Sequence, residues 1–356
     1  MEQIRQFRMG ELFCGPGGLA YGAMTAKIEN PDYRILHQWA TDYDADTCAT
    51  YIYNICHGKK GSVFHEDVRK LDMTSLGQID ALAFGFPCND YSVVGEQKGM
   101  NGVFGPLYSF GIRALKIYKP MWFVAENVGG LRNANDGKTF TKILDDMRAT
   151  GYTLTPHLYK FEKYGVPQAR HRIIIIGIRN DPEISVQFRV PSPELYSEAD
   201  NTCRNAIENP QIPANSPNNE LTNQSATVVR RLQHIKAGEN AFNADLPEEL
   251  QLNVTGAKIS QIYKRLDPKK PAYTVTGSGG GGTHIYHWEE PRALTNRERA
   301  RLQTFPDTYV FKGSKESVRK QIGMAVPCQG ARLIFEAILR TFAGIPYEWI
   351  ESNINE

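Results

Sequence analysis

Gly10-Glu11-Leu12-Phe13-Cys14-Gly15-Pro16-Gly17-Gly18 carries the clearest indication of fold in this chain. Its first part is an apolar strand, and its second part is a glycine-rich loop that leads into a helical pattern. Glycine has no β-carbon, so this backbone can approach a ligand closely at the N-terminus of the helix. The loop lacks the last glycine of a dinucleotide-binding fingerprint, which favours a mononucleoside ligand. Taken alone, it is equally well interpreted as a tight strand-to-helix turn.

Strand-like and helical patterns alternate after this loop as far as residue 180. The strand-like runs are Gly10–Phe13, Ile35–Ala40, Ile79–Phe84, Met121–Ala125, Tyr152–Tyr159 and Arg172–Ile178. The helical patterns are Asp44–Asn54, Leu107–Tyr118 and Lys138–Thr150. This alternation predicts an α/β fold of the Rossmann-like type, with a mostly parallel sheet and helices on both faces. Ligands of such sheets bind at the carboxyl ends of the strands, so we expect the residues that follow the strands to face one crevice.

The composition changes near Asn180. Residues 181–226 are rich in Pro, Asn and Ser, which predicts a smaller, loop-rich domain that continues to about residue 290. Regular structure then returns, because Thr295 and Glu298 have the spacing of a capping box and Pro327–Phe342 has a helical pattern. We expect the segments 1–180, 181–290 and 291–356, with the last one completing the first domain and packing against the first strand.

Length and hydropathy are those of an ordinary globular protein. A chain of 356 residues predicts one large domain and one smaller domain. The N-terminus lacks the pattern of a secretory signal, and no run approaches the roughly 18 apolar residues that span a bilayer. We therefore expect a cytoplasmic protein without a membrane partner. The six cysteines form no CxxC pair, so we expect reduced thiols and no metal site.

Candidate residues for chemistry occur at the ends of predicted strands. Cys88 would lie near backbone N–H groups that favour a thiolate, with buried packing as the alternative. Glu126 ends an apolar strand, where desolvation could keep its carboxyl protonated near neutral pH, with a cap or a salt bridge as the alternative. Arg170 and Arg172 alternate on one face of a strand and need an anion, for which an ion pair with Glu126 or Asp90 is the simpler interpretation.

Two acidic residues follow predicted strands nearer the N-terminus. Asp42 could accept hydrogen bonds from ribose hydroxyls, and Asp67 could accept one from an adenine amino group. Helix capping is the alternative for both. The missing last glycine of the loop favours a mononucleoside such as S-adenosyl-L-methionine.

In order and content, these motifs resemble the cytosine-5 DNA methyltransferases over essentially the whole chain, from Phe13 to Pro327. The resemblance implies that Cys88 is the nucleophile, that Glu126 acts on cytosine N3 and that Arg170 and Arg172 support Glu126. It also implies that Asn127 braces the loop of Cys88. The blocks that carry the resemblance are the glycine loop, Gly85-Phe86-Pro87-Cys88, Glu126-Asn127-Val128, Gln168-Ala169-Arg170-His171-Arg172, Arg292–Gln303 and Gln321–Pro327.

The resemblance further implies a catalytic domain over 1–180, a target-recognition domain over 181–290 and a return segment over 291–356. The residues expected to bind S-adenosyl-L-methionine are Phe13, Pro16, Gly17, Gly18, Asp42, Tyr43, Asp67, Val68, Pro87, Leu107, Met324 and Ala325.

Double-stranded DNA is the expected partner, bound by one copy of the chain, with a target base flipped out of the duplex. The net charge of +2 requires a local binding surface, and twelve Lys and Arg against eight Asp and Glu lie between Thr227 and Arg301. Glycines among residues 92–105 predict a mobile lid. We also expect a companion restriction endonuclease and a location at the nucleoid. The residues expected to bind DNA are Ser92, Arg230, Arg231, Arg265, Thr274, Gly279 and Gly280.

Two positions depart from the family pattern. Asn89 follows the cysteine where the family usually has Gln, and Met324 occupies the position of a family Asn. A thioether cannot replace the hydrogen bonds of an amide, so weaker cofactor binding is expected. Two alternatives remain open: a tRNA methyltransferase of the same family, which the long insert disfavours, and a non-catalytic relative that binds cofactor or DNA.

Overall fold

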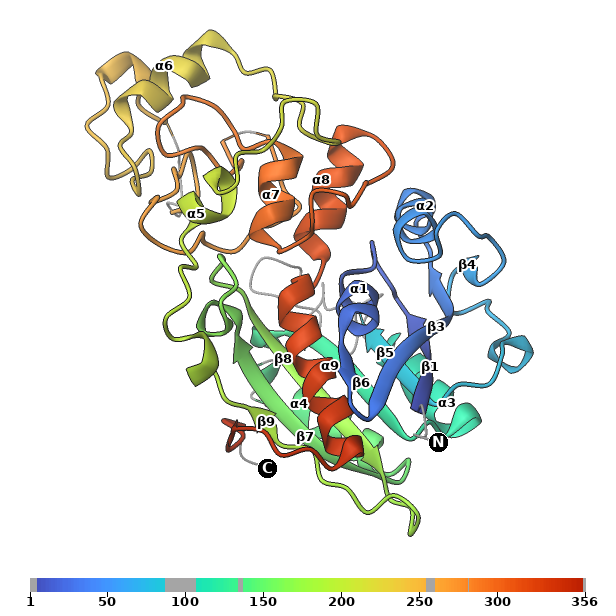
Figure 1. Ribbon diagram of the computed structural model, residues 1–356. Coiled ribbons are helices and arrows are strands. Elements are labelled where there is room, and N and C mark those ends of the chain that lie inside the picture. Colours follow the sequence, from blue (N-terminus) through green and yellow to red (C-terminus); the bar gives the residue numbers. More distant parts are fainter. Residues whose placement is uncertain (1–4, 87–106, 134–136, 254–259, 281, 355–356) are drawn as a thin grey trace. The chain divides into compact units, whose positions relative to one another are not determined.

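The computed structural model describes residues 5–86, 107–133, 137–253, 260–280 and 282–354. The chain divides into two compact units, which can be followed by residue number along the ribbon in Figure 1. Unit 1 comprises residues 1–160, 171–195 and 328–356, and unit 2 comprises residues 161–170 and 196–327.

Unit 1 is built on a mostly parallel sheet. Its strand order is β2-β3-β1-β5-β6-β8-β7, and β4 pairs with β3 outside this path. The pairs among β1, β3, β4, β5 and β6 are parallel, whereas β8 runs antiparallel between β6 and β7 and β2 runs antiparallel to β3. The predicted α/β class is confirmed. The strand bounds are β1 Arg5–Leu12, β2 Lys27–Glu29, β3 Asp32–Asp42, β4 Val63–His65, β5 Ala81–Gly85, β6 Trp122–Val128, β7 Tyr152–Lys160 and β8 His171–Arg179.

Helices and a small second sheet complete unit 1. The three predicted helices correspond to α2, α3 and α4. Each was predicted one or two residues too long, because Asp44, Leu107 and Ala149 cap these helices instead of belonging to them. A separate antiparallel sheet joins β9 (Val190–Pro191) to β10 (Trp349–Ile350). The helix bounds are α1 Gly18–Thr25, α2 Ala45–Asn54, η1 Met73–Ser75, α3 Tyr108–Tyr118, η4 Gly129–Asn133, α4 Lys138–Arg148, η6 Glu194–Tyr196 and α9 Cys328–Ala343.

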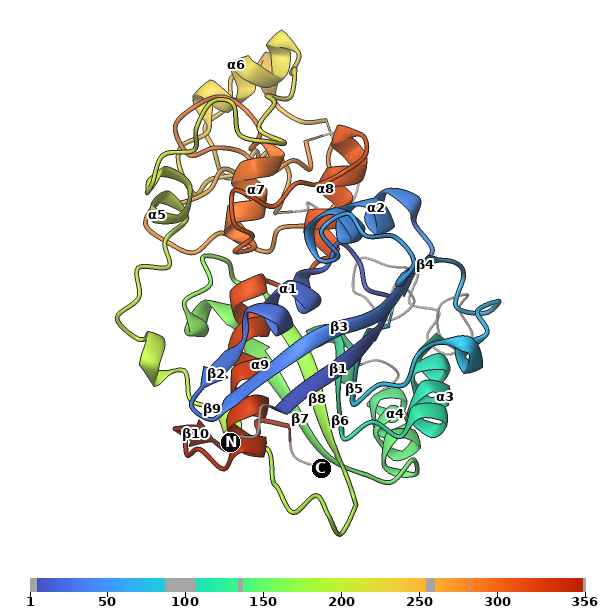
Figure 2. The ribbon, with the colours of Figure 1, turned by 45° about the vertical axis from the view of Figure 1, so that its right-hand side comes forward.

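Different helices cover the two faces of the sheet (Figures 1 and 2). On one face lies α9, where the ring of Phe342 is 5.1 Å from that of Phe7 and the ring of Phe335 is 5.9 Å from that of Trp122. On the other face, Phe123 belongs to the apolar core that includes residues of α3 and α4. Neighbouring residues of a strand point to opposite faces, so β6 supplies both layers. The prediction that the C-terminal helix packs against the first strand is confirmed.

The strand register brings the carboxyl ends of four strands to one edge of the sheet. Leu12 of β1 pairs with Thr41 of β3 and with Phe84 of β5. One residue further, Gly85 of β5 pairs with Glu126 of β6. The glycine loop, the acidic residues after β3 and the segment after β5 therefore all leave the sheet at this edge, where ligands of α/β folds bind.

Unit 2 consists mainly of loops with short helices, as its composition predicted. The predicted capping box is confirmed at the start of α7, where Glu298 N donates to Thr295 Oγ1 at 3.1 Å and Thr295 N donates to Glu298 Oε2 at 2.7 Å. A β-carbon on Gly323 would overlap the backbone of Gly277, so glycine lets α8 lie directly against the loop that begins there. The helix bounds are η5 Phe161–Tyr164, α5 Cys203–Glu208, α6 Ala226–His234, η7 Glu248–Leu250, α7 Asn296–Leu302 and α8 Lys315–Met324.

The unit boundaries differ from the segments expected at 1–180, 181–290 and 291–356. Residues 161–170 and 291–327 belong to unit 2, and unit 1 regains the chain only at Cys328. The first exchange has a clear cause, because Gln168 accepts from Val275 N at 2.8 Å and Arg170 donates to Val275 O at 3.0 Å. These buried bonds tie the short segment to unit 2.

One stretch, Lys315–Ala343, is long and apolar enough to cross a membrane by length and composition. It includes α8 and α9, and 78% of its most apolar window is buried inside the protein. Burial of this extent is typical of helices that pack in a protein core.

Candidate active site

Glu126 and Arg172 form an ion pair at the carboxyl edge of the sheet. Arg172 Nε lies 2.8 Å from Glu126 Oε1, and both side chains are nearly buried, with 12% and 13% of their surface exposed. Arg172 Nη1 also donates to the carbonyl of His171 at 2.8 Å, which fixes the guanidinium at the start of β8. The sequence offered this ion pair as the simpler interpretation of the two residues. The structure therefore holds a carboxyl group in a defined orientation at this edge.

The backbone of β5 makes room for that carboxyl group. A β-carbon on Gly85 would lie 3.1 Å from Glu126 Oε2, so a larger residue at position 85 would crowd the carboxyl. One residue later, the carbonyl of Phe86 accepts a hydrogen bond at 3.1 Å from Nδ2 of the buried Asn127. Asn127 thus holds the chain where it leaves β5. The residues Pro87, Cys88, Asn89 and Ser92 lie outside the described part of the chain.

Asp42 organises the glycine loop. Gly15 N and Asp44 N each donate to its carboxyl group at 3.0 Å, and the residue is buried. Gly15 has a φ of 54° and Gly17 a φ of 93°, in the left-handed region that glycine adopts without strain. Burial raises the pKa of Asp42, and these backbone donors oppose that rise. Sequence reasoning expected a ribose contact at Asp42, and the structure adds a role in shaping the loop itself.

The residues around this loop suit a mononucleoside. Tyr43 presents an aromatic ring that is 57% exposed, and a β-carbon on Gly15 would meet nothing within 4 Å. Asp67 is paired with Arg69 at 2.5 Å, and the Arg69 guanidinium lowers the pKa of Asp67 to about 2. A flat aromatic surface, carboxyl groups that can accept hydrogen bonds and an open glycine backbone are the groups that an adenosine moiety requires. These residues therefore fit the expected cofactor. Of the other predicted residues of unit 1, Val68 and Leu107 belong to the apolar core, Phe13 packs against that core, and Pro16 and Gly18 are buried.

A buried polar network beneath the glycine loop was not predicted. Tyr51 Oη donates to Glu11 Oε2 at 2.9 Å and lies 3.2 Å from His37 Nδ1, and His37 Nε2 lies 2.9 Å from Ser62 Oγ. Burial raises the pKa of Glu11 to about 8 and lowers the pKa of His37 to about 4. Glu11 stands inside the apolar strand that sequence analysis treated only as a support for the loop. A charged residue within a buried strand was the signal that could have identified it.

Arg170 does not share a strand face with Arg172. β8 begins at His171, and Arg170 belongs to unit 2, where its buried guanidinium donates to Val275 O at 3.0 Å and to Gly323 O at 2.9 Å. Carbonyl groups of unit 2 thus accept two hydrogen bonds from this cation, and its role beside Glu126 stays a prediction. The expected pairing with Glu126 is observed for Arg172.

The two predicted cofactor residues of unit 2 have contrasting environments. Met324 ends α8 and is 52% exposed, whereas Ala325 caps the helix and is buried.

Comparisons with known proteins identify the family of this chain. Residues 7–340 match the family model described as C-5 cytosine-specific DNA methylase. The chain belongs to this family. It is 57% identical to the Type II methyltransferase M.BbvI of Brevibacillus brevis, with 98% of this chain and 94% of that protein covered. It is 39% identical to the Type II methyltransferase M.NgoFVII of Neisseria gonorrhoeae, with 93% and 86% covered.

Solved structures show the same fold. A crystal structure of an E. coli protein, described as a DNA modification methyltransferase encoded within a prophage, superimposes with a TM-score of 0.70 at 21% identity and covers 95% of this chain and 99% of that one. The chain is thus a DNA (cytosine-5-)-methyltransferase, and its family uses S-adenosylmethionine generally. Both relatives named above are methyltransferases of the Type II class.

The arginines expected to bind DNA in this methyltransferase are engaged within unit 2. Arg265 donates to four backbone carbonyls, those of Leu232, Ile235, His287 and Glu290, at 2.7–3.0 Å. Such a residue holds loops together and has few donors left for a phosphate.

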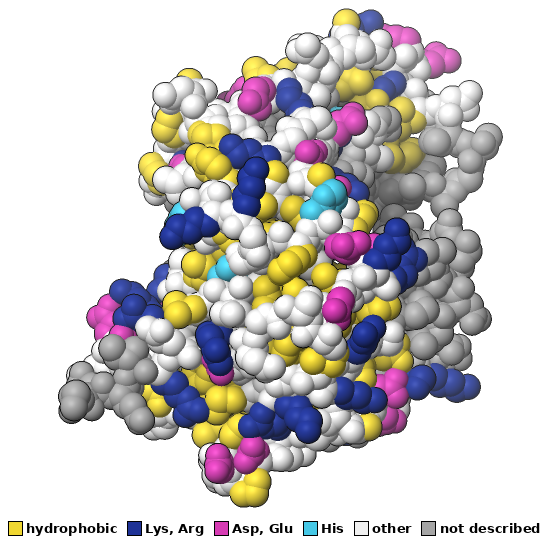
Figure 3. All heavy atoms as spheres, turned by 90° about the vertical axis from the view of Figure 1, so that its right-hand side faces the viewer, with side chains coloured by type: hydrophobic (Ala, Val, Ile, Leu, Met, Phe, Trp, Pro, Cys, Tyr) yellow, Lys and Arg dark blue, Asp and Glu magenta, His cyan; other side chains and the backbone are white. Residues whose placement is uncertain are grey.

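Two further arginines have partners of their own. Arg231 donates to Leu250 O at 2.7 Å and lies over the ring of Tyr263, and Arg230 is exposed and pairs with Glu249 at 3.1 Å. On the face drawn in Figure 3, Lys and Arg side chains are interspersed with Asp and Glu.

The other residues expected at the DNA belong to the loop that follows residue 273. Thr274 donates to Ala169 O at 2.7 Å, while Gly280 is exposed with a φ of 118° and Gly279 is half-buried.

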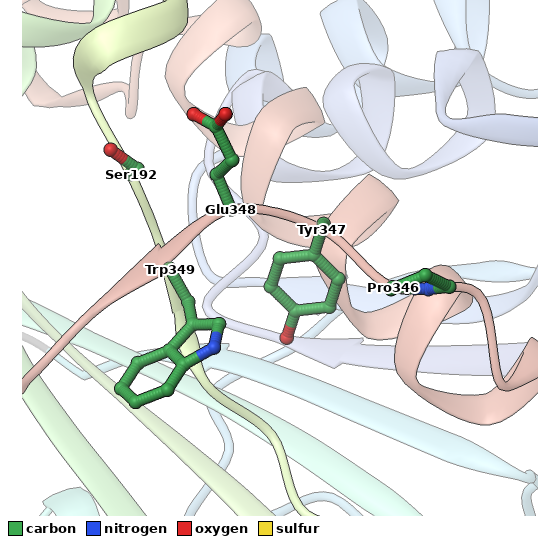
Figure 4. A pocket seen from close by; sticks show the side chains of 5 residues that line it. All are labelled: Ser192, Pro346, Tyr347, Glu348 and Trp349. Carbon is green, nitrogen blue, oxygen red and sulfur yellow. The ribbon is translucent and has the colours of Figure 1, made fainter.

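A shallow pocket lies next to β9 and β10 (Figure 4). Its lining residues are Ser192, Pro346, Tyr347, Glu348 and Trp349. The residues that line this pocket come after β8 in the sequence. β8 ends at Arg179, whereas Arg172 lies at the beginning of that strand. Ser192 N donates to Glu348 O at 2.9 Å, which joins the C-terminal segment to the chain next to β9. The pocket lies apart from the glycine loop and Glu126.

Proposed function

We propose that this enzyme is a sequence-specific methyltransferase that modifies C5 of a flipped cytosine through a covalent bond between Cys88 and C6. The observation that carries the proposal is the carboxyl group of Glu126, held by Arg172 at 2.8 Å beside Gly85, three residues before Cys88. A nucleophile and an oriented carboxyl group are the two groups that activation of a pyrimidine ring requires.

The chemistry follows from the electron-poor ring of cytosine, whose C5 is too weak a nucleophile to be methylated directly. The Cys88 thiolate attacks C6, and the new sulfur–carbon bond pushes electrons onto the ring while Glu126 hydrogen-bonds to N3. The resulting enamine is nucleophilic at C5 and takes the methyl group. A base then removes the C5 proton, the C5–C6 double bond re-forms and the thiolate leaves.

The cofactor site proposed for this reaction is the glycine loop with Asp42, Tyr43 and Asp67. S-adenosylmethionine, when bound there, would supply the electrophilic methyl group of its sulfonium, with S-adenosylhomocysteine as the second product. The backbone of the glycine loop would lie along the cofactor, Tyr43 would stack on its adenine and the two carboxylates would accept its hydroxyl and amino donors. Arg69 holds the Asp67 carboxyl in place for that contact.

Base flipping is part of the proposal because C6 is inaccessible within a stacked duplex. The loops of unit 2 would grip phosphates and read base edges, whereas the predicted lid, residues 92–105, lies outside the described residues. Because relatives at 57% and 39% identity are Type II methyltransferases, we propose that a restriction endonuclease of the same specificity accompanies the enzyme. One flipped base needs one crevice, so we propose a monomer that acts at the nucleoid.

The decisive experiment compares the wild type with Cys88→Ser. Plasmid DNA is incubated with S-adenosylmethionine and then bisulfite-sequenced, which reports product and target sequence together. We expect 5-methylcytosine at one recurrent sequence with the wild type and none with Cys88→Ser, while titration calorimetry finds the same cofactor affinity for both. Methylation by Cys88→Ser at the wild-type rate would refute the covalent mechanism.

A duplex with fluorine at cytosine C5 tests the covalent bond itself. Fluorine cannot leave as a cation, so the C5 proton step is blocked and the enzyme should stay attached to the DNA. We expect a denaturation-resistant complex with the wild type and none with Cys88→Ser. A wild type that methylates ordinary DNA yet forms no such complex would require a different route.

A further inference from the structure

Buried arginines are unusually frequent in unit 2, and most of them are satisfied by backbone carbonyls. Arg297 donates to the carbonyls of Pro217, Pro306 and Tyr309 at 2.6–3.1 Å. Arg301 forms an ion pair with Asp307 at 2.6 Å. These arginines are structural, because their donors end on groups of the protein itself.

Arg299 and Arg319 differ from these residues. Each has an Nε that is buried and has no hydrogen-bond partner among the described residues. Arg299 is completely buried, and its other donors make only long bonds, 3.3 Å to Thr276 O and 3.5 Å to His284 Nδ1. Arg319 is 7% exposed, and its ion pair is with Glu316 at 3.9 Å, on a carboxyl side chain that is 86% exposed. Such an exposed pair contributes little.

The two guanidinium groups also repel each other. Burial and the neighbouring Arg319 lower the pKa of Arg299 to about 10, and burial with both arginines lowers the pKa of His284 to about 4. His284 is therefore neutral at neutral pH and cannot add a charge. Two like charges with little compensation from acids destabilise the free protein, since a buried cation needs an anion.

The glycine-rich loop lies directly against this pair. A β-carbon on Gly279 would overlap Arg319 Nε and lie 2.8 Å from His284 Cε1. Outward from this contact, Thr276, Ser278 and Gly280 are exposed, and a β-carbon on Gly280 would meet nothing within 4 Å. The loop thus separates the two cations from solvent by little more than a backbone.

We propose that Arg319, with Arg299 behind it, and the loop 276–280 form a binding site for a backbone phosphate of DNA. This proposal rests on the proposed function and names residues for its DNA contact. Arg319 would exchange Glu316 for the phosphate, the exposed hydroxyls of Thr276 and Ser278 could donate to it, and Arg299 would add to the positive potential. The phosphate supplies the missing anion.

The first test measures the salt dependence of DNA binding. A fluorescein-labelled duplex of mixed sequence and a second, unrelated duplex are titrated with the wild type, Arg319→Gln and the control Lys320→Gln, whose exposed side chain is the next along α8. We expect Arg319→Gln to weaken the binding of both duplexes roughly tenfold. We also expect it to lower the magnitude of the slope of log K against log salt by about 1. An equal change in Lys320→Gln would show that only total charge counts and would overturn the proposal.

The second test uses the stability of the free protein. Removing one of two repelling cations should leave the thermal midpoint of Arg319→Gln unchanged or raise it, although DNA binding weakens. A structural arginine would behave in the opposite way, with a lower midpoint. A fall in both stability and DNA affinity would assign Arg319 to the fold instead of the phosphate.

A third variant leaves the net charge unchanged. Gly279→Ala places a methyl group where the Arg319 guanidinium lies, and the flexible end of that side chain must move. We expect the same direction of change in DNA affinity as for Arg319→Gln. Wild-type affinity in Gly279→Ala would contradict the site.

Two controls separate this inference from the proposed function. Wild-type protein that methylates no DNA would refute the function, whereas active wild type with an unchanged salt slope in Arg319→Gln would refute only the site. Inorganic phosphate distinguishes the source of the anion: stabilisation of wild type but not of Arg319→Gln, with equal DNA slopes, would indicate a site for free phosphate and overturn the assignment to DNA.

Discussion

Arg172 Nε and Glu126 Oε1 lie 2.8 Å apart across the antiparallel strands β8 and β6. The two residues are diagonal in the register, because Glu126 pairs with Ile174 and Arg172 pairs with Val128. Their contact crosses the strand pair and fixes the carboxyl group at the end of β6. A nearly buried guanidinium thus orients an acid that the proposed reaction needs in one position.

We expect Arg172→Lys to lower kcat about 100-fold with little effect on the affinity for S-adenosylmethionine. Lysine keeps the charge but loses the planar fork that orients the carboxyl group, and a misplaced general acid costs about this much. The measurement is single-turnover transfer of a labelled methyl group to plasmid DNA. Arg179→Lys is the matched control, since Arg179 ends the same strand and pairs with Asp181 at 2.7 Å. An equal loss in both variants would contradict the role of Arg172.

Gly85→Ala should lower kcat by about tenfold without a large change in stability. Its methyl group would lie 3.1 Å from Glu126 Oε2 and would push the carboxyl group out of position. Gly129→Ala crowds Leu158 Cδ1 at 3.2 Å and meets the carbonyl oxygen of His171 only at an ordinary contact distance of 3.8 Å, so it should keep wild-type activity. Methyl transfer and thermal melting of both variants check the expectation, and full activity in Gly85→Ala would show that the carboxyl group tolerates displacement.

Glu11 should make the protein less stable as the pH rises from about 6.5 to about 8. Burial raises the pKa of Glu11 to about 8, so the folded state keeps a proton that the unfolded state has released above its ordinary value of 4.5. The contribution of Glu11 to the free energy of unfolding is complete below pH 4.5. It is lost as the pH rises through 8, at up to about 1.4 kcal/mol per pH unit. Burial lowers the pKa of His37 to about 4, so this residue has the opposite effect: below about pH 6.5 it makes the protein more stable as the pH rises.

Glu11→Gln tests this dependence, since its amide oxygen can still accept from Tyr51. Urea unfolding between pH 6.5 and 8.5 should show a falling stability for the wild type and a flatter profile for Glu11→Gln. Parallel profiles would mean that Glu11 does not titrate in this range.

Met324→Asn should tighten cofactor binding by about 2- to 10-fold, because an amide restores a hydrogen bond that a thioether cannot make. Met324 is 52% exposed, so the substitution should not disturb the fold. Titration calorimetry with S-adenosylmethionine gives the affinity, and Met324→Gln serves as a control with a longer amide. Equal affinity in wild type and Met324→Asn would show that the methionine does not weaken the binding of S-adenosylmethionine.

Sequence patterns predicted the sheet well because its central strands are apolar on both faces and end in recognisable motifs. β5 and β6 were located within about three residues at their ends, and the capping box of α7 followed from Thr295 and Glu298 alone. β2 and β4 were missed, since each has three residues and no buried side chain. Such edge strands depend on partners that lie far away in the sequence.

The same limit explains why sequence analysis placed Arg170 on the strand of Arg172. Two arginines separated by one residue look alike in sequence, but the carbonyls of Val275 and Gly323, more than a hundred residues later, bind only one of them. The network of Glu11, Tyr51 and His37 was invisible for the same reason. Motifs identify residues that meet a ligand, whereas buried partners emerge only from tertiary contacts.

The layout of unit 1 also affects how the enzyme is made. α9 shields Phe7 and Trp122 of the central sheet, yet Cys328–Ala343 is synthesised after the whole of unit 2. Until α9 has been synthesised, this face of the sheet exposes apolar side chains to the solvent. A prematurely terminated chain would therefore be prone to aggregate, so the enzyme can become active only after translation is complete.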